Sequence, residues 1–88
     1  MINVKTDSGF SCKVNEEKID DMKFLKLLRE MEKSTYLIDD VARVMIGDEN
    51  TDKLYEHLEQ EDGRVPTSLF ITTVLEIMEK AGQKSKKS

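Results

Sequence analysis

The sequence predicts a mainly α fold, in which an N-terminal β-hairpin is followed by a compact bundle of about four helices. Over the hairpin, residues 1–14, apolar and polar side chains alternate with the period of a half-buried strand. Over residues 20–80, apolar side chains instead recur at spacings of three and four, as in helices that bury one face. The 88 residues suffice for one domain, which we place at 1–82, followed by a disordered basic tail at 83–88.

The hairpin is predicted from two short strands at 2–6 and 10–14. The residues between them are Asp7-Ser8-Gly9, and Gly9 can adopt the positive φ that a tight hairpin turn needs. An isolated hairpin is only marginally stable in water. We therefore expect its apolar face to pack on the helices.

The first two long helices are predicted at 20–33 and 35–46. Either of the two aspartates at the start of the first helix can cap it. Ser34 and Thr35 interrupt the apolar pattern and can cap the second helix. Gly47 then follows the second helix in the position where a glycine commonly ends one.

The last two helices are predicted at 51–61 and 66–80. The third helix has few apolar residues and ends at an Asp-Gly turn at 62–63. Pro66 suits the first turn of the fourth helix, because proline lacks only an N–H that has no helical partner there. Gly82 is expected to stop the fourth helix.

The charge of the chain argues against some partners. The formal net charge is −4, from 14 basic and 18 acidic residues. Nucleic acid and anionic membrane surfaces attract proteins rich in Lys and Arg, so we expect neither as a partner. Every acidic residue precedes Lys80, whereas residues 80–88 contain four lysines.

The location of the protein is expected to be cytoplasmic. Cys12 is the only cysteine and cannot form an internal disulfide, which favours a reducing compartment. The first residues lack the basic and apolar segments of a signal peptide. The longest run without a charged residue, 65–75, is too short to cross a bilayer.

The sharpest local pattern is that of a calcium-binding EF-hand loop. Asp48, Asn50, Asp52 and Glu59 have the spacing of loop positions 1, 3, 5 and 12. The sixth position, where the loop needs glycine, is Lys53. We therefore interpret the pattern as the acidic start of a helix, which complements the helix dipole, and expect no metal site.

Catalytic chemistry has little support in these residues. His57 is the only histidine, and we interpret it as part of a solvated helix face with Lys53 and Glu61 four residues to either side. Cys12 alternates with polar residues on the apolar face of the hairpin and is interpreted as a small core residue. The glycines form no phosphate-binding loop. We expect a protein that is not an enzyme and uses no cofactor.

The last helix is apolar nearly all the way round, whereas a surface helix of a small domain normally shows one apolar stripe. One interpretation is a central helix surrounded by the rest of the fold. The other is that one side packs inward while the other meets a partner protein, or a second copy of the chain in a homo-oligomer. The candidate protein-binding residues are Leu69, Phe70, Ile71, Val74, Leu75 and Met78.

Four stretches of the chain together resemble one known family. They are INVKTDSGFSCKV, DDMKFLKLLREMEK, DDVARVMIGDENTDKLYEHL and EQEDGRVPTSLFITTVLEIMEKAGQKSKKS. In this order, a hairpin, two helical segments and a final helix with a lysine-and-serine end resemble the small tail assembly chaperones of long-tailed bacteriophages and prophages. The chain departs from the family where relatives often carry more acids, since it has Thr67, Ser68, Thr72 and Thr73 there.

The resemblance implies a chaperone in the cytoplasm of a bacterial host. Such a protein binds the tape-measure protein, keeps it soluble, helps recruit tail-tube subunits and is absent from the mature virion. The family also uses a ribosomal frameshift near the end of the short form, for which lysine codons can supply a slippery stretch. The alternative interpretation is a small helical prophage regulator or adaptor that acts by protein–protein binding.

Overall fold

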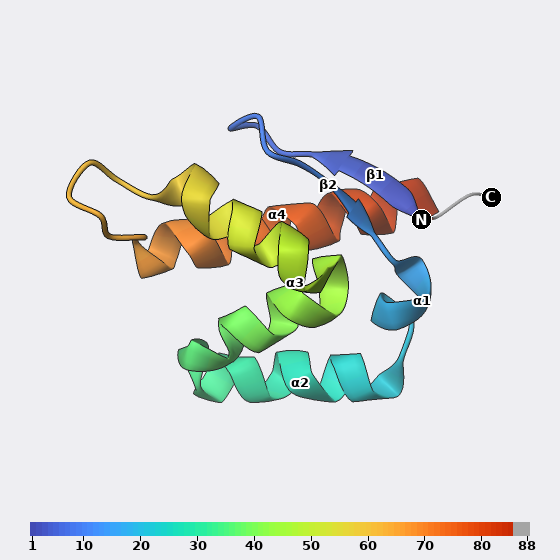
Figure 1. Cartoon of the computed structure of the whole chain (residues 1–88). Coiled ribbons are helices and arrows are strands. Elements are labelled where there is room, and N and C mark those ends of the chain that lie inside the picture. The colour runs from blue at the N-terminus through green and yellow to red at the C-terminus, as the bar shows by residue number, and fades with distance from the viewer. Residues whose placement is uncertain (86–88) are drawn as a thin grey trace.

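The computed structural model confirms the predicted fold class, a mainly α protein with an N-terminal hairpin (Figure 1). It describes residues 1–85. The elements are β1 (Ile2–Lys5), β2 (Ser11–Val14), α1 (Glu16–Ile19), α2 (Met22–Lys33), the 3-10 turn η1 (Thr35–Leu37), α3 (Ile38–Leu58) and α4 (Thr67–Ser85).

The two strands pair antiparallel, with Val4 opposite Cys12. Each strand stops one residue short of its predicted end at the turn, where the Thr6 amide donates to the Phe10 carbonyl at 2.8 Å. Gly9 lies in the turn with a φ of 95°, as the sequence predicted. The alternating residues Val4, Cys12 and Val14 are buried against the helices.

A short helix that the sequence analysis missed, α1, follows the hairpin. The Asn15 side chain caps it by accepting a hydrogen bond from the Glu17 amide at 3.0 Å. The next helix, α2, begins after Asp21, whose side chain accepts from the Lys23 amide at 2.8 Å. Of the two predicted caps, Asp21 is therefore the one that is used.

The prediction that Ser34 or Thr35 caps the following helix is wrong. No side-chain capping bond forms at Ser34. Instead η1 leads directly into α3, and the Leu37 amide donates to the Ser34 carbonyl at 3.0 Å. This i to i+3 hydrogen bond of the 3-10 type gives a backbone amide at the helix start a partner. A capping side chain would otherwise be needed to accept from it.

Gly47 forms a corner inside α3. Its φ of 86° and ψ of 165° are not helical, so α3 is two helical segments that meet there. The end of the first segment agrees with the prediction, but the second starts directly after the glycine and ends at Leu58, not at 51 and 61. A side chain of the second segment forms a hydrogen bond with the backbone at the corner. Thr51 Oγ1 donates to the Gly47 carbonyl oxygen at 2.7 Å.

The prediction that Gly82 ends the last helix is wrong. Pro66 lies just before α4, and the helix continues through Gly82 to Ser85. The physical reason is that this end is held on the hairpin, with Ala81 fully buried and Lys84 donating to the Asn3 carbonyl. Residues 83–85 of the predicted disordered tail are therefore helical, and the other three, 86–88, lie outside the described residues.

The core lies between the hairpin, α3 and α4. Val14 of β2, Leu54 of α3 and Ile77 of α4 have no exposed surface. Figure 1 shows α4 running along the hairpin and the second segment of α3, while α2 lies at the opposite edge, beside the first segment. Over the part of the chain that the structure describes, no helix has both the length and the apolar character that crossing a membrane requires.

Candidate functional site

The six candidate protein-binding residues divide into three groups in the structure. Phe70 and Val74 are 3% and 0% exposed and belong to the core, so they are not part of a binding surface. Ile71 and Met78 are half-buried at the edge of the core. Leu69 and Leu75 are 39% and 43% exposed. One side of this helix therefore belongs to the core, and the other side is partly exposed.

A narrow apolar strip runs along the outer side of α4. Ile71, Leu75 and Met78 are spaced i, i+4 and i+7, which places them in one row on a helix. We call these three residues the α4 strip. Leu69 is not in this row, because six residues at about 100° each turn it about 120° away from Leu75.

The opposite flank of α4 fastens the helix to the hairpin. The Lys80 ammonium lies 3.1 Å from both Asp7 Oδ1 and Glu76 Oε2, and it donates to the Lys5 carbonyl at 3.0 Å. Lys84 donates to the Asn3 carbonyl. These carbonyls lie on the edge of β1 that does not face β2, so the lysines cover a strand edge that would otherwise be open.

The lysines of the C-terminal region are thus not all available to a partner. The sequence analysis placed Lys84 in a free basic tail, but the structure engages it with β1. The signal for this contact was present in the sequence, since Glu76, Lys80 and Lys84 are spaced by four and share one side of a helix. Nothing in the sequence indicated that this side faces the hairpin.

Two of the four residues of the calcium-like pattern, Asp48 and Asp52, belong to a different kind of site. The Arg43 guanidinium binds three carboxylates, at 2.9 Å from Asp39, 3.1 Å from Asp48 and 3.2 Å from Asp52. Asp39 precedes the corner at Gly47, whereas the other two follow it. Arg43 therefore joins the two segments of α3, and within residues 1–85 no cluster of His, Cys, Asp or Glu could hold a metal ion.

The Arg43 site shifts the pKa values of its members. Desolvation acts to raise the pKa of Asp39, but hydrogen bonds from Arg43 and from Tyr55 outweigh it, so the pKa lies below its ordinary value of 3.8. Tyr55 donates its hydroxyl to Asp39 at 2.7 Å. Burial, together with this bond to a carboxylate, raises the pKa of Tyr55 to about 12. Tyr55 therefore stays protonated as a donor, and its role here is structural.

His57 contacts the hairpin and not the residues predicted from its helix. Its Nε2 lies 3.1 Å from Ser8 Oγ, and its ring centre is 5.5 Å from that of Phe10. Lys53 instead pairs with Glu49, and Glu61 lies beyond the end of α3. His57 is exposed, as the interpretation of a solvated helix face requires. The expected pairing with Lys53 and Glu61 does not form among the described residues, because the fold brings the hairpin turn against this face.

Cys12 has the environment of a core residue. It is 7% exposed, and burial raises the pKa of its thiol to about 11. A nucleophilic cysteine needs a lowered pKa, usually from a nearby cation or helix N-terminus. Cys12 therefore remains a protonated, buried thiol at neutral pH.

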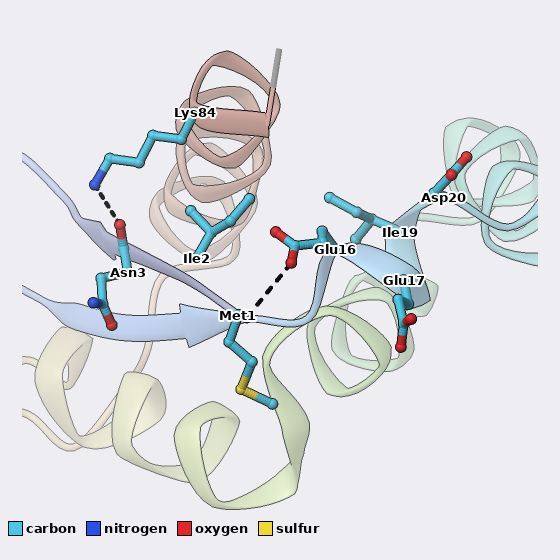
Figure 2. A pocket seen from close by; sticks show the side chains of 8 residues that line it. All are labelled: Met1, Ile2, Asn3, Glu16, Glu17, Ile19, Asp20 and Lys84. Carbon is cyan, nitrogen blue, oxygen red and sulfur yellow. Dashed lines mark hydrogen bonds and ion pairs between the residues drawn. The ribbon is translucent and has the colours of Figure 1, made fainter. Parts of the chain in front are cut away.

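An open hollow lies where the start of β1, α1 and the end of α4 meet (Figure 2). Ile2 and Ile19 form its apolar part, and the Met1 amino group lies 3.5 Å from Glu16 Oε1. Figure 2 shows the carboxylates of Glu16, Glu17 and Asp20 pointing in different directions. Because they do not converge on a point, the hollow has no arrangement that would hold a cation or a reacting group.

Comparisons of the chain with family models, with curated proteins and with solved structures found no match.

Proposed function

We propose that this protein is a tail assembly chaperone of a long-tailed bacteriophage or prophage. It acts in the cytoplasm of the bacterial host by binding other proteins, not as an enzyme. Its main client is the tape-measure protein, which it keeps soluble, and it helps to recruit tail-tube subunits before it leaves the assembly. It is absent from the finished virion.

The observation that carries the proposal is the α4 strip. Leu75 is 43% exposed, and Ile71 and Met78 remain partly open although they touch the core. A row spaced i, i+4 and i+7 gives a helix an apolar face that can pack against the apolar face of a second, amphipathic helix. A long helical client with many such faces would be shielded in segments by many copies of a small acidic protein, whose net charge keeps the complex dispersed.

The sequence supplies the second line of support. The resemblance to the family covers nearly the whole chain, from the hairpin INVKTDSGFSCKV to the final helix. The part most typical of the family is the acidic helix, the DGRVP turn that follows it, and the final helix with its lysine-and-serine end. The α4 strip lies on this same helix.

Co-expression with the tape-measure protein encoded beside the gene tests the proposal. The wild type should raise the soluble fraction of the client, and Leu75→Asp should lose most of this effect by placing a charge on the strip. Leu69→Asp is the matched control, because Leu69 has a similar exposed fraction and lies on the same helix but outside the strip. Circular dichroism establishes that both variants are folded.

Three outcomes would count against the proposal. Wild-type protein that leaves the client insoluble would favour the regulator or adaptor function. Equal loss in both variants would mean that the strip is not the binding surface. If Leu75→Asp and Ile71→Asp both merely unfold the chain, α4 is only a core helix.

A further inference from the structure

The outer face of α2 carries a second exposed apolar site. Met22 and Leu25 are 76% and 49% exposed, and they line a shallow hollow with Lys23, Lys26 and Arg29. We call these five residues the α2 face. The opposite side of the helix packs inward and consists of Phe24, Leu27, Leu28 and Met31.

The spacing of the residues along the sequence explains why α2 has one apolar side that packs inward and one exposed side that is partly apolar and partly basic. Met22, Leu25, Lys26 and Arg29 are at i, i+3, i+4 and i+7 and form one row on the helix surface. The inward residues repeat the same spacing two positions later in the chain. The helix is thus anchored from one side and presents a mixed apolar and basic row to solvent on the other.

The charge of the α2 face is unbalanced. Lys23, Lys26 and Arg29 have no ion pair with any residue in the described range 1–85, whereas Arg43, Arg64 and Lys80 each have at least one. The protein as a whole has a net charge of −4, so this basic surface stands out against an acidic molecule. An approaching acidic group would gain an ion pair there without breaking an existing one.

We propose that the α2 face binds an acidic amphipathic helix of a partner protein, independently of the α4 strip. Apolar side chains of the partner helix would contact Met22 and Leu25, and its carboxylates would meet Lys26 and Arg29 on either side. The complementarity of charge selects the partner, while the two apolar residues supply burial. This binding does not depend on the proposed chaperone function.

Other occupants fit the α2 face less well. An isologous contact between two copies would bring the same three cations of each chain together, which is repulsive. An anionic membrane would attract these cations, but it would repel the acidic remainder of the molecule, and two apolar side chains give little area for insertion. An acidic helix avoids both difficulties.

The experiment uses the full chain labelled with nitrogen-15 and two capped helical peptides. Both peptides carry leucines at i, i+3, i+4 and i+7, flanked by glutamates in one and by lysines in the other. The glutamate peptide should shift the backbone amide signals of residues 22–29 and leave those of the α4 strip unchanged. The lysine peptide should cause no such shifts, and added salt should weaken the binding of the glutamate peptide.

A matched pair of charge reversals tests the role of the cations. Lys26→Glu should weaken binding of the glutamate peptide about tenfold at low salt, because it removes one attraction and adds a repulsion. Lys13→Glu changes the net charge equally but lies on the hairpin, and it should change the affinity by less than about twofold. Leu25→Ala should also weaken binding, through the lost apolar contact.

Several results would overturn the proposal. They are equal binding of both peptides, shifts centred on α4, or equal effects of the two charge reversals. Failure of the glutamate peptide to bind at about millimolar concentration would also overturn it. So would anionic vesicles shifting residues 22–29 where the peptide does not, or the same shifts appearing on concentration of the protein alone, which would indicate a membrane or a second copy.

Discussion

The helices α2 and α4 both have an inward apolar side, yet the fold uses them differently. On α4 the inward residues Phe70, Val74, Ile77 and Ala81 are all buried. On α2 only Phe24 is buried, and its other inward residues are half-exposed. α4 is therefore the structural centre of this small domain, while α2 is attached at its edge.

The neighbours of the two helices account for the difference. α4 contacts β1 along one flank and α3 along another, and Tyr55 of α3 stacks on Phe70 with ring centres 4.7 Å apart. α2 packs on the first segment of α3 and to the same extent on η1, and it has a smaller contact with α1. A binding surface on α4 is therefore coupled to stability, whereas the α2 face can change with little effect on the fold.

Truncation of one inward residue on each helix tests this difference most strongly. Ile77→Ala should lower the free energy of unfolding by about 2–5 kcal/mol, because it leaves a cavity in a fully enclosed site. Leu28→Ala on α2 should lower it by only about 1 kcal/mol, since Leu28 is half-exposed and its site can fill with solvent. Chemical denaturation followed by circular dichroism measures both values. Equal losses would contradict the peripheral position of α2.

Two glycine substitutions test whether the bend of α3 at Gly47, which lies between α2 and α4, requires glycine. Gly47 has a φ of 86° and a ψ of 165°, a region that is essentially restricted to glycine. Gly47→Ala should therefore lower the free energy of unfolding by about 1–3 kcal/mol through backbone strain alone, because the added Cβ meets nothing within 4 Å.

Gly82→Ala is the control for the corner and should act in the opposite direction. Gly82 lies in α4 without a positive φ, and a Cβ there also meets nothing within 4 Å. Alanine should raise the free energy of unfolding by about 0.5–1 kcal/mol, since it restricts the unfolded chain and favours the helix. Destabilisation by Gly82→Ala would mean that α4 ends before Ser85 in solution.

These two glycines also show what the sequence could and could not predict. Both were expected to end helices, because glycine is common after a last helical turn. At Gly47 the local preference agreed with the fold. At Gly82 it was overridden by contacts from the hairpin, seventy or more residues earlier, which no local pattern reveals. The fold class followed from apolar periodicity, which is local.

The candidate sites were predictable to a smaller degree. Periodicity indicated that the last helix has more apolar residues than one inward-facing stripe needs. It could not separate core residues such as Phe70 from exposed ones such as Leu75. That division depends on which flank the hairpin covers. The Arg43 site was missed because two of its carboxylates, Asp48 and Asp52, were considered as metal ligands. Their partner Arg43 lies five residues before Asp48, in the preceding helical segment.

An effect that depends on pH is expected at the Arg43 site, which joins the two segments of α3 and so links the α2 side to the α4 side. Asp39→Asn should lower the free energy of unfolding by about 1 kcal/mol at neutral pH, because a charge-assisted bond to Arg43 becomes a neutral one. The pKa of Asp39 is lowered in the folded state, so its stabilising effect is present above its ordinary pKa of 3.8 and disappears as the pH falls through the folded value.

Comparison with a neighbouring aspartate isolates this contribution. Asp40→Asn makes the same change of charge in the same first turn of α3, but Asp40 is exposed and has no hydrogen bond or ion pair within residues 1–85. It should therefore change the free energy of unfolding by less than about 0.5 kcal/mol at any pH. The difference between wild type and Asp39→Asn should shrink towards zero as the pH is lowered below 3.8, because the wild-type carboxyl is then neutral as well. A difference that stays constant with pH would mean that the effect of Asp39 does not come from its charge. A difference that Asp40→Asn reproduces would mean that Asp39 acts through the helix dipole and not through Arg43.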